Sequence, residues 1–451
     1  MAHEPDTAVE ERPAPTSAVD RFFHLTESGT TVRTEIVAGV TTFLAMAYII
    51  FVNPSILEVA GMDAGAVFVA TCVAASLGTA IMGLWARYPI AQAPGMGLNA
   101  FFAFTVVLGM GIPWETALAG TLVSGFLFFL LALSGVRKAV LNAIPLQLKL
   151  AVGAGIGVFI AFIGLRNAGI VVADEDTIVS LGEITSGLTM LAVFGVIATA
   201  LFLLRGLRGG VFYGMVVTAV LGVVTGLIDA PSAAVSSVPS VAPTFGEAWV
   251  NLPELLTGQM VIVVFTMLFV DFFDTAGTLI AVANQAGFLD ADGQLPRANR
   301  ALISDSIATM GGATVGTSTT TSYIESAAGV GAGGRTGLTS VVTAGLFLLS
   351  LAFSPLLAVV TPEVTAPALI IVGVMMAKGL GGIDWDKLEF AIPAFVTVVA
   401  MPLTFSIAHG IALGLFLFPL MMVFKGRHRE VHPLMYALAA IFAVYFIWLL
   451  E

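Results

Sequence analysis

The apolar sequence between Met267 and Val330 contains two polar segments, VDFFDTAGT at residues 270–278 and GTSTTTSYIESAAG at residues 316–329. Three acids lie in these segments, namely Asp271, Asp274 and Glu325. A charged side chain at the centre of a bilayer costs about 2.5–3.5 kcal/mol on insertion scales, so such groups usually face a partner, a cavity or a pathway. If this region crosses a membrane, the two segments locate a candidate functional centre.

The composition indicates a polytopic α-helical membrane protein. The chain has 451 residues, of which 58% are hydrophobic and 10% are charged, and runs of about 18 or more apolar residues recur along it. The net charge of −11, without a basic patch, argues against a nucleic-acid partner. A single cysteine, Cys72, excludes intrachain disulfides, and the five histidines lack metal-ligand spacing. We therefore expect no metal site and no cofactor.

The hydrophobic pattern predicts fourteen membrane segments and a last apolar stretch at about 434–450. The segments lie at roughly 35–57, 66–85, 96–111, 115–135, 148–170, 188–205, 211–229, 260–282, 301–313, 322–332, 337–358, 364–379, 390–406 and 408–424. Segments 96–111, 301–313 and 322–332 are too short or too interrupted by Gly and Pro to span alone. Non-helical backbone at membrane depth occurs only inside protein or beside water. We therefore expect half-helices preceded by extended strands at the third and tenth segments.

The two halves of the chain correspond, which predicts two inverted repeats of seven segments. Asn53 in the first segment corresponds to Asp271 and Asp274 in the eighth, and Asn99 in the third corresponds to Glu325 in the tenth. With a cytoplasmic N-terminus, nearly all basic residues of the loops fall on the cytoplasmic side, as the positive-inside rule requires. The last apolar stretch is then either a fifteenth crossing or a helix in the membrane interface.

The polar and aromatic residues of these segments suit a flat ligand that carries N–H groups. The candidate binding residues are Asp274, Glu325, Asn99, Asp271, Phe102, Phe273, Thr321 and Asn53. Carboxylates accept hydrogen bonds, an amide side chain both donates and accepts, and phenylalanine rings can stack on a planar ligand. Asp271 and Asn53 have an equally good structural interpretation, because buried polar groups often tie helices together. The carboxylates of Asp274 and Glu325 also suit proton coupling.

At these residues the sequence resembles the azaguanine-permease-like branch of the nucleobase–cation symporter superfamily, which carries hypoxanthine, guanine and adenine. The resemblance rests on long strings outside the two polar segments as well. These strings are GTTVRTE at 29–35, TTFLAMAYIIFVNP at 41–54, APGMGLNAFF at 93–102 and EVHPLMY at 430–436.

The resemblance implies a core domain of segments 1–4 and 8–11 and a gate domain of segments 5–7 and 12–14, through which relatives form homodimers. The implied bounds are 21–135 and 259–360 for the core, and 136–258 and 361–451 for the gate with the C-terminal segment. Residues 1–20 precede these domains, and their polar, acidic and Pro-containing composition predicts a disordered cytoplasmic tail. The resemblance has a further implication for the site. It also implies a substrate held by an eighth-segment acid, Asp274, and a tenth-segment acid, Glu325, with Asn99 as the third-segment asparagine. The register in which Asp271 binds instead stays open.

The sequence therefore predicts a proton-coupled importer of purine nucleobases in the cell membrane, working by alternating access, and not an enzyme. One alternative is an anion transporter of the sulfate/bicarbonate type on the same fold, which three acids at the site disfavour. Another alternative is a channel. A channel needs a continuous polar pore, usually built by symmetric subunits, whereas the polar residues here cluster at one depth.

Overall fold

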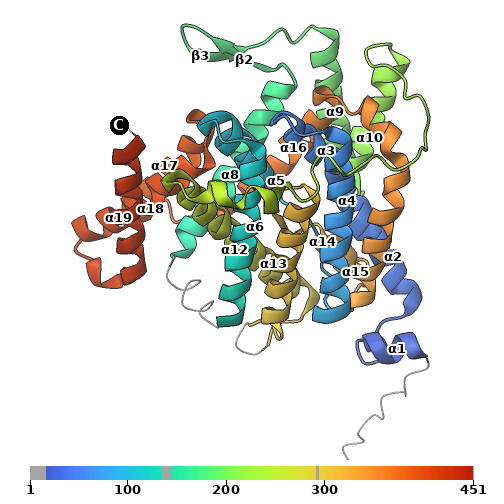
Figure 1. Cartoon of the computed structure of the whole chain (residues 1–451), viewed down its shortest axis with the longest axis horizontal. Coiled ribbons are helices and arrows are strands. Elements are labelled where there is room, and N and C mark those ends of the chain that lie inside the picture. The colour runs from blue at the N-terminus through green and yellow to red at the C-terminus, as the bar shows by residue number, and fades with distance from the viewer. Residues whose placement is uncertain (1–16, 135–143, 291–293, 450–451) are drawn as a thin grey trace, which may run out of the picture.

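Helices make up most of the protein (Figure 1). The computed structural model describes residues 17–134, 144–290 and 294–449. Most of the predicted tail lies outside these ranges, and its last residues enter a short helix, α1. The helices of the first half are α1 (Ala18–Phe23), α2 (Val32–Met46), α3 (Ile49–Glu58), α4 (Ala64–Ile81), α5 (Met96–Ala100), α6 (Trp114–Ser134), α8 (Leu146–Asn167), α9 (Gly187–Leu204), α10 (Gly210–Val224) and α11 (Glu247–Val250), with the π-helices η1 (Met82–Ala86) and η2 (Phe101–Gly109) and the 3₁₀ helix η3 (Leu252–Leu255).

The second half continues the same architecture. Its helices are α12 (Gly258–Ala286), α13 (Ala298–Val315), α14 (Ser326–Gly331), α15 (Gly337–Leu349), α16 (Pro362–Ala377), α17 (Leu388–Leu403), α18 (Ile407–Phe424) and α19 (Pro433–Leu449), with the 3₁₀ helices η4 (Ser350–Val359), η5 (Lys378–Gly382) and η6 (His428–Glu430). Within the described ranges, nine helical spans are long and apolar enough to cross a membrane, and each of the fourteen predicted segments overlaps at least one helix. The prediction of an all-α polytopic membrane protein is confirmed.

Two short strands precede the half-helices, as predicted for the third and tenth segments. Strand β1 (Gln92–Pro94) pairs antiparallel with β4 (Thr320–Ser322), with Ala93 opposite Thr321. Helix α5 begins two residues after β1 and continues into η2. Helix α14 begins four residues after β4 and is only six residues long. The strand pair thus joins two distant parts of the sequence in the middle of the helical bundle.

Helix α13 is longer than predicted. The ninth segment is predicted at about 301–313, but the helix begins at Ala298, continues through Gly311 and Gly312 to Val315, and ends before Gly316, whose φ of 104° lies in the left-handed region. Gly312 is needed for packing, because a Cβ atom there would lie 2.7 Å from the hydroxyl oxygen of Thr320. Within the described residues, α13 is not among the nine helical spans that are apolar enough to cross a membrane, so the prediction that this segment does not span alone stays a prediction.

Packing contacts divide most helices into two groups. Helices α2, α4, α6, α12, α13, α14 and α15 pack on one another, and α8, α9, α10, α16, α17 and α18 pack on one another. In the first group, the fully buried carboxylate of Glu35 in α2 accepts hydrogen bonds from the backbone N–H groups of Arg335, Thr336 and Thr339. These donors lie at the start of α15, so one side chain joins the first segment to the eleventh.

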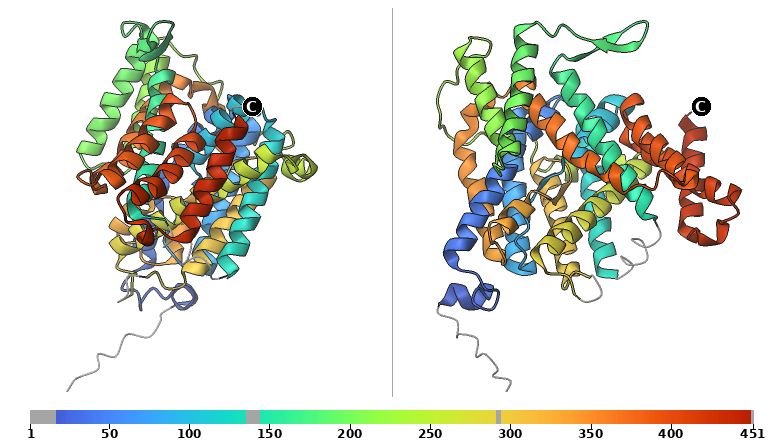
Figure 2. Two further views of the ribbon diagram at one scale, coloured as in Figure 1. Left: turned by 90° about the vertical axis from the view of Figure 1, so that its left-hand side faces the viewer. Right: turned by 180° about the vertical axis from the view of Figure 1, so that it is seen from behind.

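Two features were not predicted. A hairpin of β2 (Val171–Asp174) and β3 (Ile178–Leu181) extends from the end of the molecule opposite to α1 (Figures 1 and 2). An ion-pair cluster precedes α19, in which Arg427 contacts Glu389 at 2.7 Å and Glu430 at 2.6 Å. The hydrogen bonds from Arg427 lower the pKa of Glu430 below its ordinary value.

The last apolar stretch forms a helix, α19, which packs against α18 (Figure 1). The ring of Phe442 in α19 also contacts the ring of Phe265 in α12, with 6.3 Å between the centroids. Helix α19 therefore touches one helix of each packing group. Its placement across the membrane or in the interface stays a prediction.

Candidate functional site

The strand pair positions the two half-helices that carry the candidate residues. Besides the paired strands, the Gly95 N–H donates to the Thr319 carbonyl at 2.9 Å, and the Tyr323 N–H donates to the Ala91 carbonyl at 2.9 Å. These bonds satisfy backbone groups that would otherwise be unpaired inside the protein. Because the strands are antiparallel, α5 and α14 leave from opposite ends of the pair. Each half-helix therefore starts beside the partner strand, in the middle of the fold.

Asp274 and Glu325 lie close together at this place. Asp274 is in the middle of α12 and is exposed, and Glu325 is the half-buried N-cap residue of α14. Their carboxyl groups are close enough to interact electrostatically. The hydroxyl of Tyr48 donates to Glu325 Oε1 at 2.7 Å. Tyr48 is 1% exposed and lies at the break between α2 and α3, so a third broken helix contributes to the site.

One face of α12 connects Asp274 to the C-terminal end of that helix. Asp274, Gly277, Ala281 and Asn284 are all exposed, and their spacing of three or four residues places them on one side of the helix. A Cβ atom added to Gly277 would meet nothing within 4 Å. In contrast, most residues of α12 from Met260 to Phe272 are buried. Asp274 is thus accessible along the C-terminal half of α12 and shielded along the N-terminal half.

The two asparagines bind the threonine-rich segment between α13 and β4. The amide nitrogen of Asn53 donates to the hydroxyls of Thr71 at 2.7 Å and Thr317 at 2.8 Å. The Asn99 side-chain oxygen accepts a hydrogen bond from Ser318. In both residues the other amide atom, Oδ1 of Asn53 and Nδ2 of Asn99, is buried and has no protein partner. Both side chains therefore hold the non-helical backbone in place and keep one free polar atom.

Asp271 and Thr321 belong to a buried polar network that includes Asp305, a residue absent from the sequence-based predictions. Asp305 is fully buried on α13 and accepts hydrogen bonds from the side chains of Gln92 (2.9 Å), Ser322 (2.9 Å) and Thr275 (2.8 Å). The Thr321 hydroxyl lies 2.8 Å from that of Thr275. This network joins α12 and α13 to both strands of the pair.

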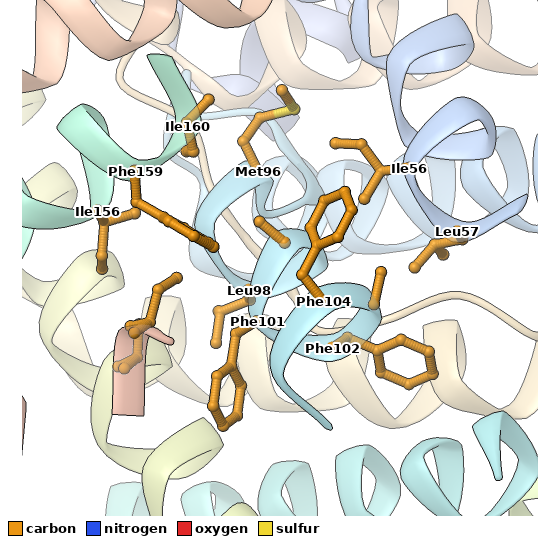
Figure 3. Packing of buried hydrophobic residues seen from close by; sticks show 14 of the residues in the cluster. Ile56, Leu57, Met96, Leu98, Phe101, Phe102, Phe104, Ile156, Phe159 and Ile160 are labelled. Atoms are coloured by element: carbon orange, nitrogen blue, oxygen red, sulfur yellow. The ribbon is translucent and has the colours of Figure 1, made fainter. Parts of the chain in front are cut away.

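The predicted aromatic residues occupy different environments. Phe102 is fully buried in the main hydrophobic core. Figure 3 shows it on the side of η2 where Ile56 and Leu57 lie, whereas Phe101 points to a different side. Phe273 is half-buried, and the Lys149 ammonium of α8 lies 5.4 Å from its ring centroid. Phe273 therefore lies where α12 meets α8, one helix from each packing group.

The structure thus brings Asp274 and Glu325 together at an accessible place, with Asn99, Asn53, Asp271 and Thr321 in the polar scaffold around it. Tyr48, Gln92 and Asp305 were not predicted. Asp305 carried a signal in the sequence, because it is an acid inside a hydrophobic segment, like Asp271 and Asp274. Tyr48 carried no such signal.

Comparison with known proteins shows the family. Residues 33–413 match the model of the Permease family. The chain belongs to this family. The permease is 56% identical over 437 residues to the guanine/hypoxanthine permease PbuG of Bacillus subtilis (strain 168), a match that covers 95% of the permease and 99% of PbuG. It is 44% identical over 427 residues to the adenine permease AdeQ of Escherichia coli (strain K12), covering 94% and 95%.

These relatives confirm the resemblance to the azaguanine-permease-like branch, and they confirm that the permease is a transporter and not an enzyme. The transmembrane domain of a cyanobacterial bicarbonate transporter, BicA, has a similar fold, with a TM-score of 0.61 over 85% of the permease and 97% of that chain. The sequence identity is 16%, so this likeness concerns the fold alone.

Proposed function

We propose that the permease imports purine nucleobases together with protons by alternating access. The observation that carries this proposal is the meeting of Asp274 and Glu325, from α12 and α14, at an accessible place beside two half-helices. The names of PbuG and AdeQ, which are guanine/hypoxanthine and adenine permeases, support the class of cargo.

The chemistry of the site suits a purine. A purine base is flat and presents ring and exocyclic N–H groups, and two carboxylates can accept hydrogen bonds from them. Charge-assisted hydrogen bonds of this kind are about twice as strong as neutral ones. The free Nδ2 atom of Asn99 adds a donor for a ring nitrogen or carbonyl. Phe273 is the half-buried aromatic residue next to Asp274 and is the better placed of the two predicted rings for stacking.

The arrangement of basic residues supports a cytoplasmic N-terminus. The Arg87 side chain contacts the His24 ring nitrogen at 2.8 Å, and Arg297 lies over the Tyr88 ring at 4.8 Å. Residues from both halves of the chain thus gather near α1, at the end opposite to the β2–β3 hairpin (Figure 1). The positive-inside rule assigns such an end to the cytoplasm. The exposed face of α12 leads to the same end, so we assign the structure to an inward-facing state.

The two packing groups support the proposed division into core and gate domains. Asp274 lies on α12 and Glu325 caps α14, both in the core group. The ammonium of Lys149 on α8, in the gate group, lies 5.4 Å from the ring of Phe273, the neighbour of Asp274. Movement of one group against the other would open the site to alternate sides of the membrane. Assembly of a homodimer through the gate domain remains a prediction from the resemblance.

An uptake assay tests the proposal. In a host that lacks purine transport, the permease should give saturable uptake of radiolabelled hypoxanthine, guanine or adenine that an uncoupler abolishes. Uptake that persists after collapse of the proton gradient would disprove proton coupling. Absence of uptake of all three bases, with the protein present in the membrane, would disprove the cargo assignment.

Substitutions at the acids test the site. Glu325→Ala should abolish uptake, because it removes the acceptor on α14. Asp274→Asn should reduce uptake more than Asp271→Asn, since Asp274 is exposed and Asp271 is buried within the scaffold. The opposite order would show that Asp271 is the binding residue.

The anion-transporter alternative has one favourable observation, the fold shared with BicA. Asp271, Asp274 and Asp305 speak against it, because three acids near one site repel a small anion. Competition by purines, and none by sulfate or bicarbonate, would decide between the two. The channel alternative predicts uptake that does not saturate.

A further inference from the structure

Helix α14, which has Glu325 as its N-cap residue, is too short to fix its own orientation. It has six residues, Ser326–Gly331, and an isolated helix shorter than about 12 residues is marginal, because few internal hydrogen bonds offset the cost of nucleation. The position of Glu325 beside Asp274 therefore depends on the contacts that α14 makes with neighbouring elements.

Three side chains from three other elements donate hydrogen bonds to carbonyl groups of α14. Arg208, between α9 and α10, and Arg335, before α15, donate to the last two carbonyls of the helix, at 3.1 Å and 2.8 Å. Positive charge at this end also interacts favourably with the helix dipole. Gln285, near the end of α12, donates through Nε2 to the carbonyl of Ala327 at 3.1 Å.

The Gln285 contact differs from the other two because it joins α14 to the helix that carries the other cargo acid. It is the one hydrogen bond between α12 and α14 within the described residues. Gln285 lies eleven residues after Asp274, about three helical turns, so both side chains are on the same exposed face of α12. Ala327 lies two residues after Glu325. The bond thus links the two elements that hold the cargo acids.

The place of the Gln285 amide indicates an indirect role. A Cβ atom added to Gly331 would lie 3.6 Å from Gln285 Nε2 and 3.9 Å from Arg208 Nη2. The amide is therefore beside the C-terminal end of α14, whereas Glu325 caps the N-terminal end. A helix of six residues is about 9 Å long, so Gln285 acts on the site through α14.

We propose that Gln285 is a positioning residue that sets the distance between Asp274 and Glu325. Without its amide donor, α14 shifts more easily against α12, and a cargo molecule that meets one carboxylate at hydrogen-bond distance no longer meets the other. Cargo binding then weakens, while the movement of one packing group against the other is unaffected. The proposal rests on the proposed function for the identity of the cargo, but the link between α12 and α14 can be measured without cargo.

Uptake kinetics of the full-length permease, normalised to the amount in the membrane, are the first test. Gln285→Met keeps the length of the side chain and removes its donor. It should raise the KM for the transported purine about two- to five-fold, the effect of one exposed hydrogen bond, with an unchanged maximal rate. Gln285→Lys restores a donor and should recover most of the wild-type KM. Gln259→Met replaces an exposed glutamine at the start of the same helix and is the matched control, with an unchanged KM.

Hydrogen–deuterium exchange of the purified permease in detergent, without nucleobase, is the second test. Exchange reports local opening of an element separately from global unfolding. The backbone amides of residues 326–334 should exchange about two- to five-fold faster in Gln285→Met than in the wild type. Gln285→Lys should restore the slower rate, and Gln259→Met should not change it.

Three results would overturn the proposal. One is an unchanged exchange rate of α14 in Gln285→Met. Another is a lower maximal rate and unfolding temperature with an unchanged KM, as expected of a residue that only stabilises the fold. The third is an equal rise of KM in Gln285→Met and Gln285→Lys, because the donor is then not the relevant group. A wrong cargo assignment would instead remove purine uptake from the wild type and leave the exchange measurement intact, so the two proposals fail independently.

Discussion

Among the described residues, one side chain donates a hydrogen bond to the Glu325 carboxylate. The donor is the Tyr48 hydroxyl, at 2.7 Å. A hydrogen bond to a charged group contributes about 1.5–3 kcal/mol when its removal leaves the partner unsatisfied. We expect Tyr48→Phe to raise the KM for purine uptake at least about 10-fold, with a smaller change in maximal rate, because Glu325 loses its fixed orientation. Initial uptake rates over a range of purine concentrations measure both quantities.

Ser340→Ala is the control for Tyr48→Phe. Its hydroxyl is also buried but donates to the backbone carbonyls of Tyr88 (2.7 Å) and Ile90 (3.0 Å), away from the acids. It should lower the unfolding temperature without changing KM. If Tyr48→Phe behaves in the same way, Tyr48 is a packing residue.

Single residues differ in how far the sequence predicts them. Asp271, Asp274 and Glu325 stand out because an acid in apolar sequence needs a reason. Asp305 satisfies the same criterion in ALISDSIATM. However, Gly311 and Gly312 after this segment predict a broken helix, so the acid is not singled out as a site residue. Tyr48 is unpredictable from the sequence because its partner is 277 positions away, and only the fold brings them together.

At the level of elements, a glycine or proline predicts a helix break only where close packing against a neighbouring element does not itself require that residue. Pro94 ends β1 and Gly95 separates that strand from α5, as expected. Gly311 and Gly312 do not end α13, because they are required where the helix touches Leu77 and Thr320. A glycine in a membrane helix can therefore mark either a break or a close contact, and the local sequence does not distinguish them.

Two glycines on α8 test this distinction. A Cβ atom at Gly157 would lie 2.5 Å from Met376 Cβ and 2.9 Å from the Gly373 carbonyl, whereas one at Gly153 would meet nothing within 4 Å. Gly157→Ala should destabilise the permease by about 1–3 kcal/mol through overpacking. Gly153→Ala should be neutral or stabilising by up to about 1 kcal/mol, from the better helix propensity of alanine. Thermal unfolding of both variants measures this, and equal Tm values would contradict the close contact between α8 and α16.

For the whole molecule, the inverted repeat was predicted from faint correspondences such as Asn99 with Glu325. The antiparallel pairing of β1 with β4 is the feature that such a relation predicts, since equivalent segments of the two halves meet there. The course of the chain after α18 was not predictable. It depends on the contacts of Arg427 with Glu389 and Glu430, because Glu389 lies in α17 and Glu430 in η6, just before α19.

A last prediction concerns the state of the whole transporter. Cys72 is the single cysteine and is fully buried, so an introduced cysteine is the reactive thiol. Ala281→Cys lies on the exposed face of α12, and Ala283→Cys is a buried control on the same helix. An impermeant maleimide should label Ala281→Cys from the cytoplasmic side in inverted vesicles and should not label Ala283→Cys. Labelling of Ala281→Cys from the outer side alone would contradict the inward-facing assignment.

Arg208 should bias this equilibrium, because it joins the two packing groups. Its guanidinium, in the turn between α9 and α10, donates to the Gly331 carbonyl at the end of α14 at 3.1 Å. A hydrogen bond at an exposed position contributes roughly 0.5–1 kcal/mol, which is a two- to five-fold change in the ratio of two states. Arg208→Ala should therefore reduce the rate of cytoplasmic labelling of Ala281→Cys, by at most about that factor. Lys378→Ala, which removes a cation elsewhere in the second group, should leave the rate unchanged; an unchanged rate in Arg208→Ala as well would show that the contact does not stabilise the inward-facing state.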